Sequence, residues 1–102
     1  MRFINLTPHA VVLNDGTTYP ASGVVARVSA TYTDFSPEGI AEVKFGEAVG
    51  LPPPREDTMY IVSGLLKQAC PDRADLVSPA TGHPACSRDE QGRILSVPGF
   101  VR

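Results

Sequence analysis

The stretch YIVSGLLKQACPDRADLVSP, residues 60–79, decides the fold because it holds two apolar, strand-like runs on either side of a helix-like segment. The first run begins slightly earlier, as TMYIV at 58–62, and carries no charge, which is typical of a strand buried on both faces. The second run, DLV at 75–77, follows after about a dozen residues, the minimum for a crossover between parallel strands. We therefore expect these two runs to be parallel neighbours at the centre of a sheet.

A helix is expected between the two runs. Ser63 is a good N-cap residue, and Pro71 cannot continue a helix. Between them, apolar residues recur with the spacing of one helix face. The sequence therefore predicts one short helix at about 64–70.

The turn that enters this helix is the first candidate binding site. Such a turn leaves backbone N–H groups free, here near Ser63, Gly64 and Leu65, and these groups can hold an anion. Because a helix this short has a weak dipole, we expect Arg27 or Arg73 to complete the site. A phosphate loop would show a second glycine or a following lysine, and neither is present. A helix cap without a ligand accounts for the same residues.

Further strands are expected on both sides of this central unit. Alternating or β-branched runs indicate them at 2–6, 10–13, 17–20, 24–32, 40–45, 87–90 and 93–97. Asp15-Gly16 predicts a hairpin between the second and third of these runs, with positive φ at both central turn residues. In the fourth run, the side that carries Val24 is expected to face the core, and Arg27 to lie mid-strand on the polar face.

The pattern as a whole predicts a single α+β domain over residues 1–102. We expect a mostly antiparallel, strongly curved sheet or a small barrel, with the one short helix. The prolines of LPPPRED, 51–57, exclude a helix there because each fixes φ and removes a donor. The segment ATGHPACS, 80–87, has no periodic pattern and is expected to be a surface loop, and Gln91-Gly92 predicts a turn.

Composition limits the classes of function. The chain is 42% apolar and 20% charged with a net charge of −2, which is ordinary for a globular protein. No apolar run approaches the roughly 18 residues of a membrane span, and the start of the chain lacks the apolar core of a secretory signal. We therefore expect a protein of the host cell cytoplasm with no membrane partner. Neither half has the basic excess of a nucleic-acid binder, so nucleic acid is not an expected partner.

The soft and imidazole side chains are His9, Cys70, His83 and Cys86. We expect both cysteines to be free thiols, because cytosolic proteins keep them reduced. The four residues match no standard zinc spacing, and His9 is expected to be a turn histidine bonded to backbone carbonyls. A flexible loop is a poor place to order a Cys86–His83 nucleophile pair. The sequence thus predicts no catalytic residue, no metal ligand and no cofactor.

The seven arginines outnumber the two lysines, which favours planar, bidentate contacts. Arg73 precedes Asp75, and Arg88 precedes Asp89, so each arginine can pair with a neighbouring carboxylate or bind an external carboxylate or phosphate. Structural ion pairs and protection of sheet edges explain them equally well.

Several segments of the chain resemble one family of small, uncharacterised proteins that occur in phage and prophage genomes and in some bacterial chromosomes. The segments that carry the resemblance are INLTPHAVVL, ASGVVARV, GLPPP, TMYIVSGLL, RADLVSP and RDEQGRI. The loop ATGHPAC looks like an addition to the shorter family pattern. The resemblance brings no catalytic residues, and it implies a compact accessory protein of a mobile element.

These observations predict a non-catalytic binding protein of the phage or mobile-element type. Its expected partner is a host protein or a small anionic ligand such as a nucleotide, with interference with host defence as the specific form. One alternative is a structural component of a virion or its assembly. Another is a small enzyme acting on a nucleotide-like substrate through Ser63, Arg27 and Asp75. Exposed sheet edges also allow a homo-oligomer.

Overall fold

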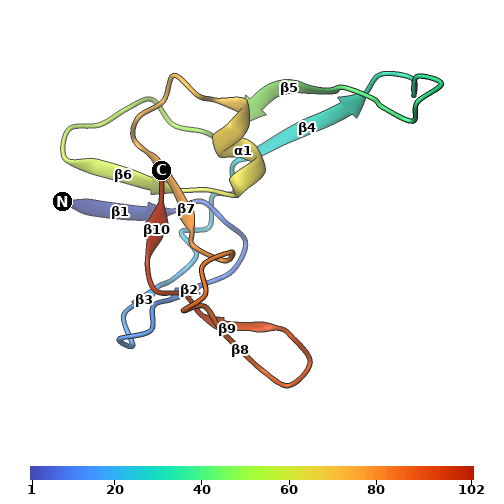
Figure 1. The fold of residues 1–102 in the computed structure, drawn as a ribbon. Coiled ribbons are helices and arrows are strands. Elements are labelled where there is room, and N and C mark those ends of the chain that lie inside the picture. Colours follow the sequence, from blue (N-terminus) through green and yellow to red (C-terminus); the bar gives the residue numbers. More distant parts are fainter.

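The computed structural model describes residues 1–102, and Figure 1 shows a central sheet with smaller hairpins around it. The elements in chain order are β1 (Arg2–Asn5), β2 (Val11–Val12), β3 (Thr18–Tyr19), β4 (Arg27–Tyr32), β5 (Val43–Val49), β6 (Thr58–Ile61), α1 (Gly64–Ala69), β7 (Leu76–Pro79), β8 (Ser87–Arg88), β9 (Ile94–Ser96) and β10 (Phe100–Val101). Four strands form one sheet in the order β1-β6-β7-β10, and the others form three two-stranded sheets: β2-β3, β4-β5 and β8-β9.

The central sheet confirms the arrangement expected for the opening stretch. Strand β6 lies between β1 and β7 and is parallel to both, with Tyr60 opposite Leu76 and Ile61 opposite Val77. Helix α1 makes the crossover from β6 to β7. Its N-cap is Ser63, whose side chain accepts a hydrogen bond from the Leu66 N–H, and the helix ends before Cys70. The predicted strand, cap and helix are therefore confirmed.

The core has two parts, one on each face of the central sheet. Because successive strand residues point to opposite faces, Tyr60 and Val62 enter one cluster, and Met59 and Ile61 enter the other. The first cluster lies under α1, through Leu66, and under the base of β4-β5. The second cluster lies beside β2-β3 and β8-β9, on the opposite side of the sheet in Figure 1. All four residues of β6 are buried for this reason.

The β4-β5 hairpin, residues 27–49, extends beyond the body of the protein, and we call it the β4–β5 arm (Figure 1). Its outer end makes the Cα radius of gyration 15.4 Å, where a compact chain of this length has about 13 Å. The expected core face of this run is confirmed, because Ala26 is buried and Val28 packs against the first core cluster, although Val24 at the start of the run is 50% exposed. The strand begins only at Arg27, which is therefore its first residue and not mid-strand.

The two predicted short hairpins are present, and the turn of the first differs from expectation. In β2-β3, Val11 lies opposite Tyr19, but the loop spans 14–16 because the Leu13 N–H donates to the Thr17 carbonyl. Only Gly16 in this loop has positive φ, at 93°, as in a three-residue hairpin loop that ends in a left-handed glycine. In β8-β9, the turn at Gln91-Gly92 is confirmed, and its strands are shorter than expected.

The protein is thus rich in strands with one short helix. Antiparallel pairing holds in the three small sheets and between β7 and β10, whereas the centre of the main sheet is parallel. The expected small barrel is not formed, because β1 and β10 are separate edges of the main sheet. No helix is long and apolar enough to cross a membrane.

Candidate functional site

A groove of about 820 Å³ lies beside the start of α1. Its lining comes from five places in the chain: 7–12 after β1, 62–68 at the start of α1, 78–83 at the end of β7 and after it, 94–97 in β9 and just after it, and Val101 in β10. Most of its apolar lining comes from aliphatic side chains such as Val11, Val62 and Val97. Its volume lies in the range of small-molecule sites, about 300–1,000 Å³, which are likewise mostly apolar with few polar groups.

The charged and titratable side chains that line the groove are Lys67, His9 and His83, and no carboxylate lines it. Lys67 is half-buried and takes part in none of the three ion pairs of the protein. An ammonium group beside an apolar surface, with no acid to compensate it, favours a negatively charged ligand. The groove therefore has the electrostatic character of an anion site.

Asn5 holds the segment that carries His9. The Asn5 Nδ2 donates to the carbonyls of His9 and Tyr19, at 2.8 and 3.0 Å. Its Oδ1 accepts from the backbone N–H and the hydroxyl of Thr7, at 2.9 and 2.6 Å. The buried amide thus uses both donors and both acceptor positions. The carbonyl of His9 accepts one bond from the Asn5 Nδ2 and one from the Thr7 hydroxyl, whereas its imidazole donates to no carbonyl, so the expected turn-histidine role is wrong.

His83 also lines the groove, from the loop after β7. Its Nδ1 accepts a hydrogen bond from the Ala85 N–H at 3.0 Å, so the neutral ring carries its proton on Nε2. Asn14 donates to the carbonyl of Ala85, and this bond ties the loop to the β2–β3 hairpin. The expected surface loop is therefore anchored, and its Cys86 side chain packs against the second core cluster.

The residues of the predicted anion site are only partly brought together. Ser63 and Gly64 line the groove, whereas Leu65 is 45% exposed outside it. Arg27 lies in β4 and lines neither the groove nor the smaller hollow beyond the other end of α1. Arg73 lines that smaller hollow.

Arg73 is engaged in contacts within the protein and does not line the groove. Its guanidinium donates to both carboxylate oxygens of Asp75 at 2.9 Å and to the carbonyl of Pro52 at 2.9 Å. The hydrogen bonds from Arg73 lower the pKa of the Asp75 carboxyl, and the same contact raises the pKa of the guanidinium. The expected Arg73–Asp75 pair is confirmed and holds the guanidinium in place. The hydrogen bond to the Pro52 carbonyl joins this loop, between α1 and β7, to the 51–57 connection.

The other candidate side chains lie apart. Arg88 donates to the carbonyls of Thr81 and Gly92, while Asp89 pairs with Arg93, so the expected Arg88–Asp89 pair is not formed. Cys70 packs on the first core cluster and Cys86 on the second, and both are free thiols, as expected. No three side chains of His, Cys, Asp or Glu gather in one place.

Lys67 is the functional candidate that sequence reasoning missed. It follows the N-cap Ser63 by four residues, and its N–H donates to the Ser63 carbonyl at 3.1 Å. Residues four apart share one helix face, so this spacing was a usable signal for a lysine beside the cap.

Searches find no match to the chain among family models, curated proteins or solved structures.

Proposed function

We propose that this chain is a non-catalytic binding protein whose groove binds a small anionic ligand with an apolar part, a nucleotide being the leading class. One observation carries the proposal: a half-buried lysine without an ion-pair partner lies in an apolar groove that no carboxylate lines. The apolar walls would contact a base or a ribose face, and Lys67 would contact a phosphate.

The polar groups around Lys67 suit the same ligand. Gln68, Thr81 and Ser96 also line the groove and add neutral donors and acceptors. Nε2 of His83, whose Nδ1 accepts from the Ala85 N–H, gives one more donor in the groove. Such a mixture of one cation, several neutral donors and aliphatic surface is what a phosphorylated, partly apolar molecule needs.

The proposed setting is a phage- or prophage-borne accessory protein in the host cell cytoplasm that interferes with host defence. The resemblance of the sequence to the phage-borne family supports this setting. A host protein is the other form of the binding hypothesis. The projecting β4–β5 arm favours one alternative, a virion or assembly component, because Tyr32 and Phe35 at its end are 70% and 73% exposed.

Enzyme chemistry has less support. Ser63 lines the groove, but Arg27 and Asp75 do not, so the three residues named for catalysis do not share a hollow. Ser63 is also engaged as the helix cap. For the fold, we propose the α+β class, with α1 covering one face of a curved mixed sheet.

Calorimetric titration tests the proposal. ADP-ribose, ATP and a cyclic dinucleotide are titrated into the wild-type protein, Lys67→Gln and Lys44→Gln. Lys44 is the only other lysine and lies exposed on the β4–β5 arm, so it is the matched control for lost charge. A charge-assisted hydrogen bond is worth about 1.5–3 kcal/mol, so Lys67→Gln should weaken binding about tenfold or more.

The control separates the outcomes. Saturable heat with one of the three ligands, weakened by Lys67→Gln and unchanged by Lys44→Gln, supports the anion groove. No heat with any ligand, or equal weakening by both lysine variants, contradicts it and leaves a protein target as the surviving form of the binding hypothesis.

A further inference from the structure

Helix α1 has the groove beside its start and a smaller hollow, of about 300 Å³, beside its end. Lys67 and Gln68 line both of them. From these two residues the groove extends to Gly64 at the start of the helix, and the smaller hollow extends to Cys70 and Pro71 after its end. The helix has six residues and is about 9 Å long. The two hollows are therefore neighbours, and one ligand can reach both.

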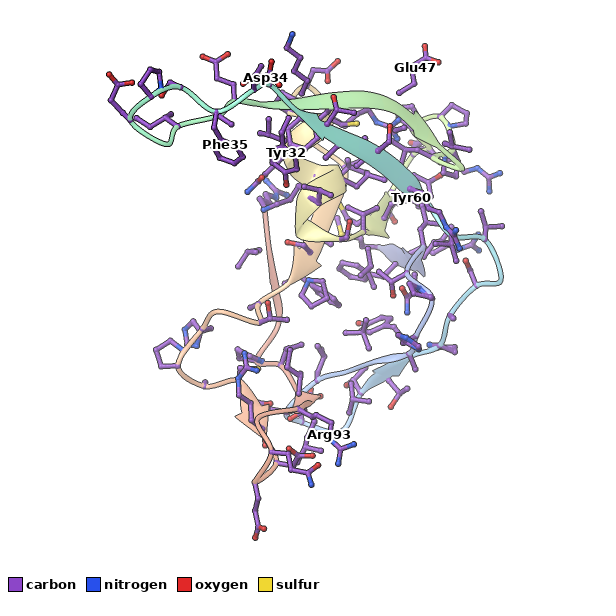
Figure 2. All side chains as sticks on the ribbon, turned by 90° about the vertical axis from the view of Figure 1, so that its right-hand side faces the viewer. Tyr32, Asp34, Phe35, Glu47, Tyr60 and Arg93 are labelled. Carbon is purple, nitrogen blue, oxygen red and sulfur yellow. The ribbon has the colours of Figure 1, made fainter.

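The smaller hollow is basic. Its charged side chains are those of Lys67, Arg73 and Arg102, and no carboxylate side chain lines it. The carboxylates labelled in Figure 2, Asp34 and Glu47, lie on the β4–β5 arm and line neither hollow. A volume of about 300 Å³ is at the lower limit of small-molecule sites, so this hollow suits one group of a ligand and not a whole ligand. The group that it favours is negatively charged.

The guanidinium of Arg73 has donors left for such a group. Its Nε and Nη2 donate to Asp75, and Nη2 also donates to the Pro52 carbonyl, whereas Nη1 donates to no atom of the protein. These bonds hold the guanidinium in place, so the two N–H groups of Nη1 are positioned before a ligand arrives. Asp75 offsets the charge of Arg73, and the net positive charge of the hollow comes from Lys67 and Arg102. Planar arginine donors fit phosphate oxygens.

We propose that the ligand is a nucleotide with a terminal phosphate on a polyphosphate chain, such as a nucleoside triphosphate. This inference rests on the proposed function, because it places the base in the groove. The chain passes Lys67, which lines both hollows, and the terminal phosphate lies in the smaller hollow with Arg73 and Arg102. A terminal phosphate suits this hollow better than a bridging one, because it has more free oxygens and more negative charge.

Calorimetric titration with AMP, ATP and ADP-ribose tests the need for this phosphate. ATP should bind about tenfold more tightly than the other two, because AMP is too short to reach the smaller hollow and ADP-ribose ends in a ribose. Arg73→Lys keeps a charge for Asp75 but loses the planar donors, so it should remove most of this advantage. Arg102→Gln should reduce it about threefold. Arg55→Gln is the matched control and should leave it unchanged, because Arg55 is exposed and lines neither hollow.

The thiol of Cys70 gives a local readout of the smaller hollow. Cys70 is half-buried and lines this hollow, whereas Cys86 lines neither hollow. Alkylation with iodoacetamide, followed by mass spectrometry of the peptides, measures both thiols in one sample. Saturating ATP should slow the alkylation of Cys70 severalfold, and saturating AMP should not. Cys86 is the internal control and should react at the same rate throughout.

The two proposals fail in different ways. ATP binding no tighter than AMP binding, an ATP advantage unchanged in Arg73→Lys, or unprotected Cys70 at saturating ATP overturns the terminal-phosphate inference and leaves the proposed function intact. No saturable heat with AMP, ATP, ADP-ribose or a cyclic dinucleotide overturns both. Tightest binding of ATP, loss of its advantage in Arg73→Lys and protection of Cys70 together support the inference.

Discussion

Replacing Asn5 with alanine should destabilise the protein more than the small size of the removed amide group suggests. Asn5 is 2% exposed, and its amide makes four hydrogen bonds that join the end of β1 to the following turn and to β3. A net contribution of about 1 kcal/mol per bond gives about 4 kcal/mol for the set. Water can replace some of these bonds, because the His9 end of the turn is exposed. We therefore expect Asn5→Ala to lower the free energy of unfolding by about 3 kcal/mol.

This loss is large for a domain whose total stability is of the order of 5–15 kcal/mol. The expected fall in melting temperature is about 15 °C, at roughly 4–8 °C per kcal/mol for this chain length. Urea unfolding followed by circular dichroism measures the change. Thr7→Val is the matched control, since it removes the Thr7 hydroxyl bonds to Asn5 and His9 but keeps the rest of the Asn5 network. It should cost about 1 kcal/mol.

Asn5→Asp separates hydrogen bonding from packing. The aspartate keeps an oxygen for Thr7 but turns an oxygen toward the carbonyls of His9 and Tyr19, which accepted bonds from the amide nitrogen. It should be at least as damaging as Asn5→Ala despite its nearly unchanged volume. A loss below that of Thr7→Val for either Asn5 variant would refute the reasoning.

Three further changes have expected outcomes. Gly50→Ala should destabilise the fold by about 2 kcal/mol or more in urea unfolding, because φ is +81° and a Cβ would lie 2.6 Å from the Val25 carbonyl oxygen; wild-type stability would contradict the close approach. Ser63→Ala should cost about 1 kcal/mol as a lost cap, with or without ligand; an unchanged urea midpoint would argue against the cap. Arg73 lowers the pKa of Asp75, so this pair stabilises the fold above about pH 4 and loses its effect as the pH falls through the lowered pKa. Asp75→Asn should remove that part of the acid dependence; the same acid profile in wild type and variant would show that another carboxylate is responsible.

The features that the sequence predicted correctly depend on local signals. A strand followed at once by a short helix is specified by the uncharged run before Ser63, by Ser63 as the cap and by Pro71 as the stop. The number of residues between this strand and Leu76 is enough for a crossover between parallel strands. The turn at Gly16 was also local. Only Gly16 takes positive φ there, so the turn is not the type with positive φ at both central residues that Asp15-Gly16 predicted.

The features that the sequence did not predict depend on distant segments. The core face with Ala26 and Val28 was predicted, but the strand begins only at Arg27, since the Ala26 N–H before it donates to the Leu6 carbonyl. The groove draws on five places in the chain between residues 7 and 101, so no single stretch of sequence carries its pattern. Arg73 follows the helix and therefore lies at the end of α1 away from Ser63, where Asp75 engages it.

Backbone amide mapping by nuclear magnetic resonance tests the central claim, that the groove is the ligand site, most directly. The ¹⁵N-labelled protein is titrated separately with ADP-ribose, ATP and a cyclic dinucleotide. If the groove is the ligand site, at least one of these ligands should cause saturable shifts of backbone amide resonances. These shifts should be concentrated in 62–68, 78–83 and 94–97 and absent from the outer end of the β4–β5 arm. Saturable shifts confined to the arm or to the surroundings of Arg73, or no saturable shift with any of the three, would contradict it.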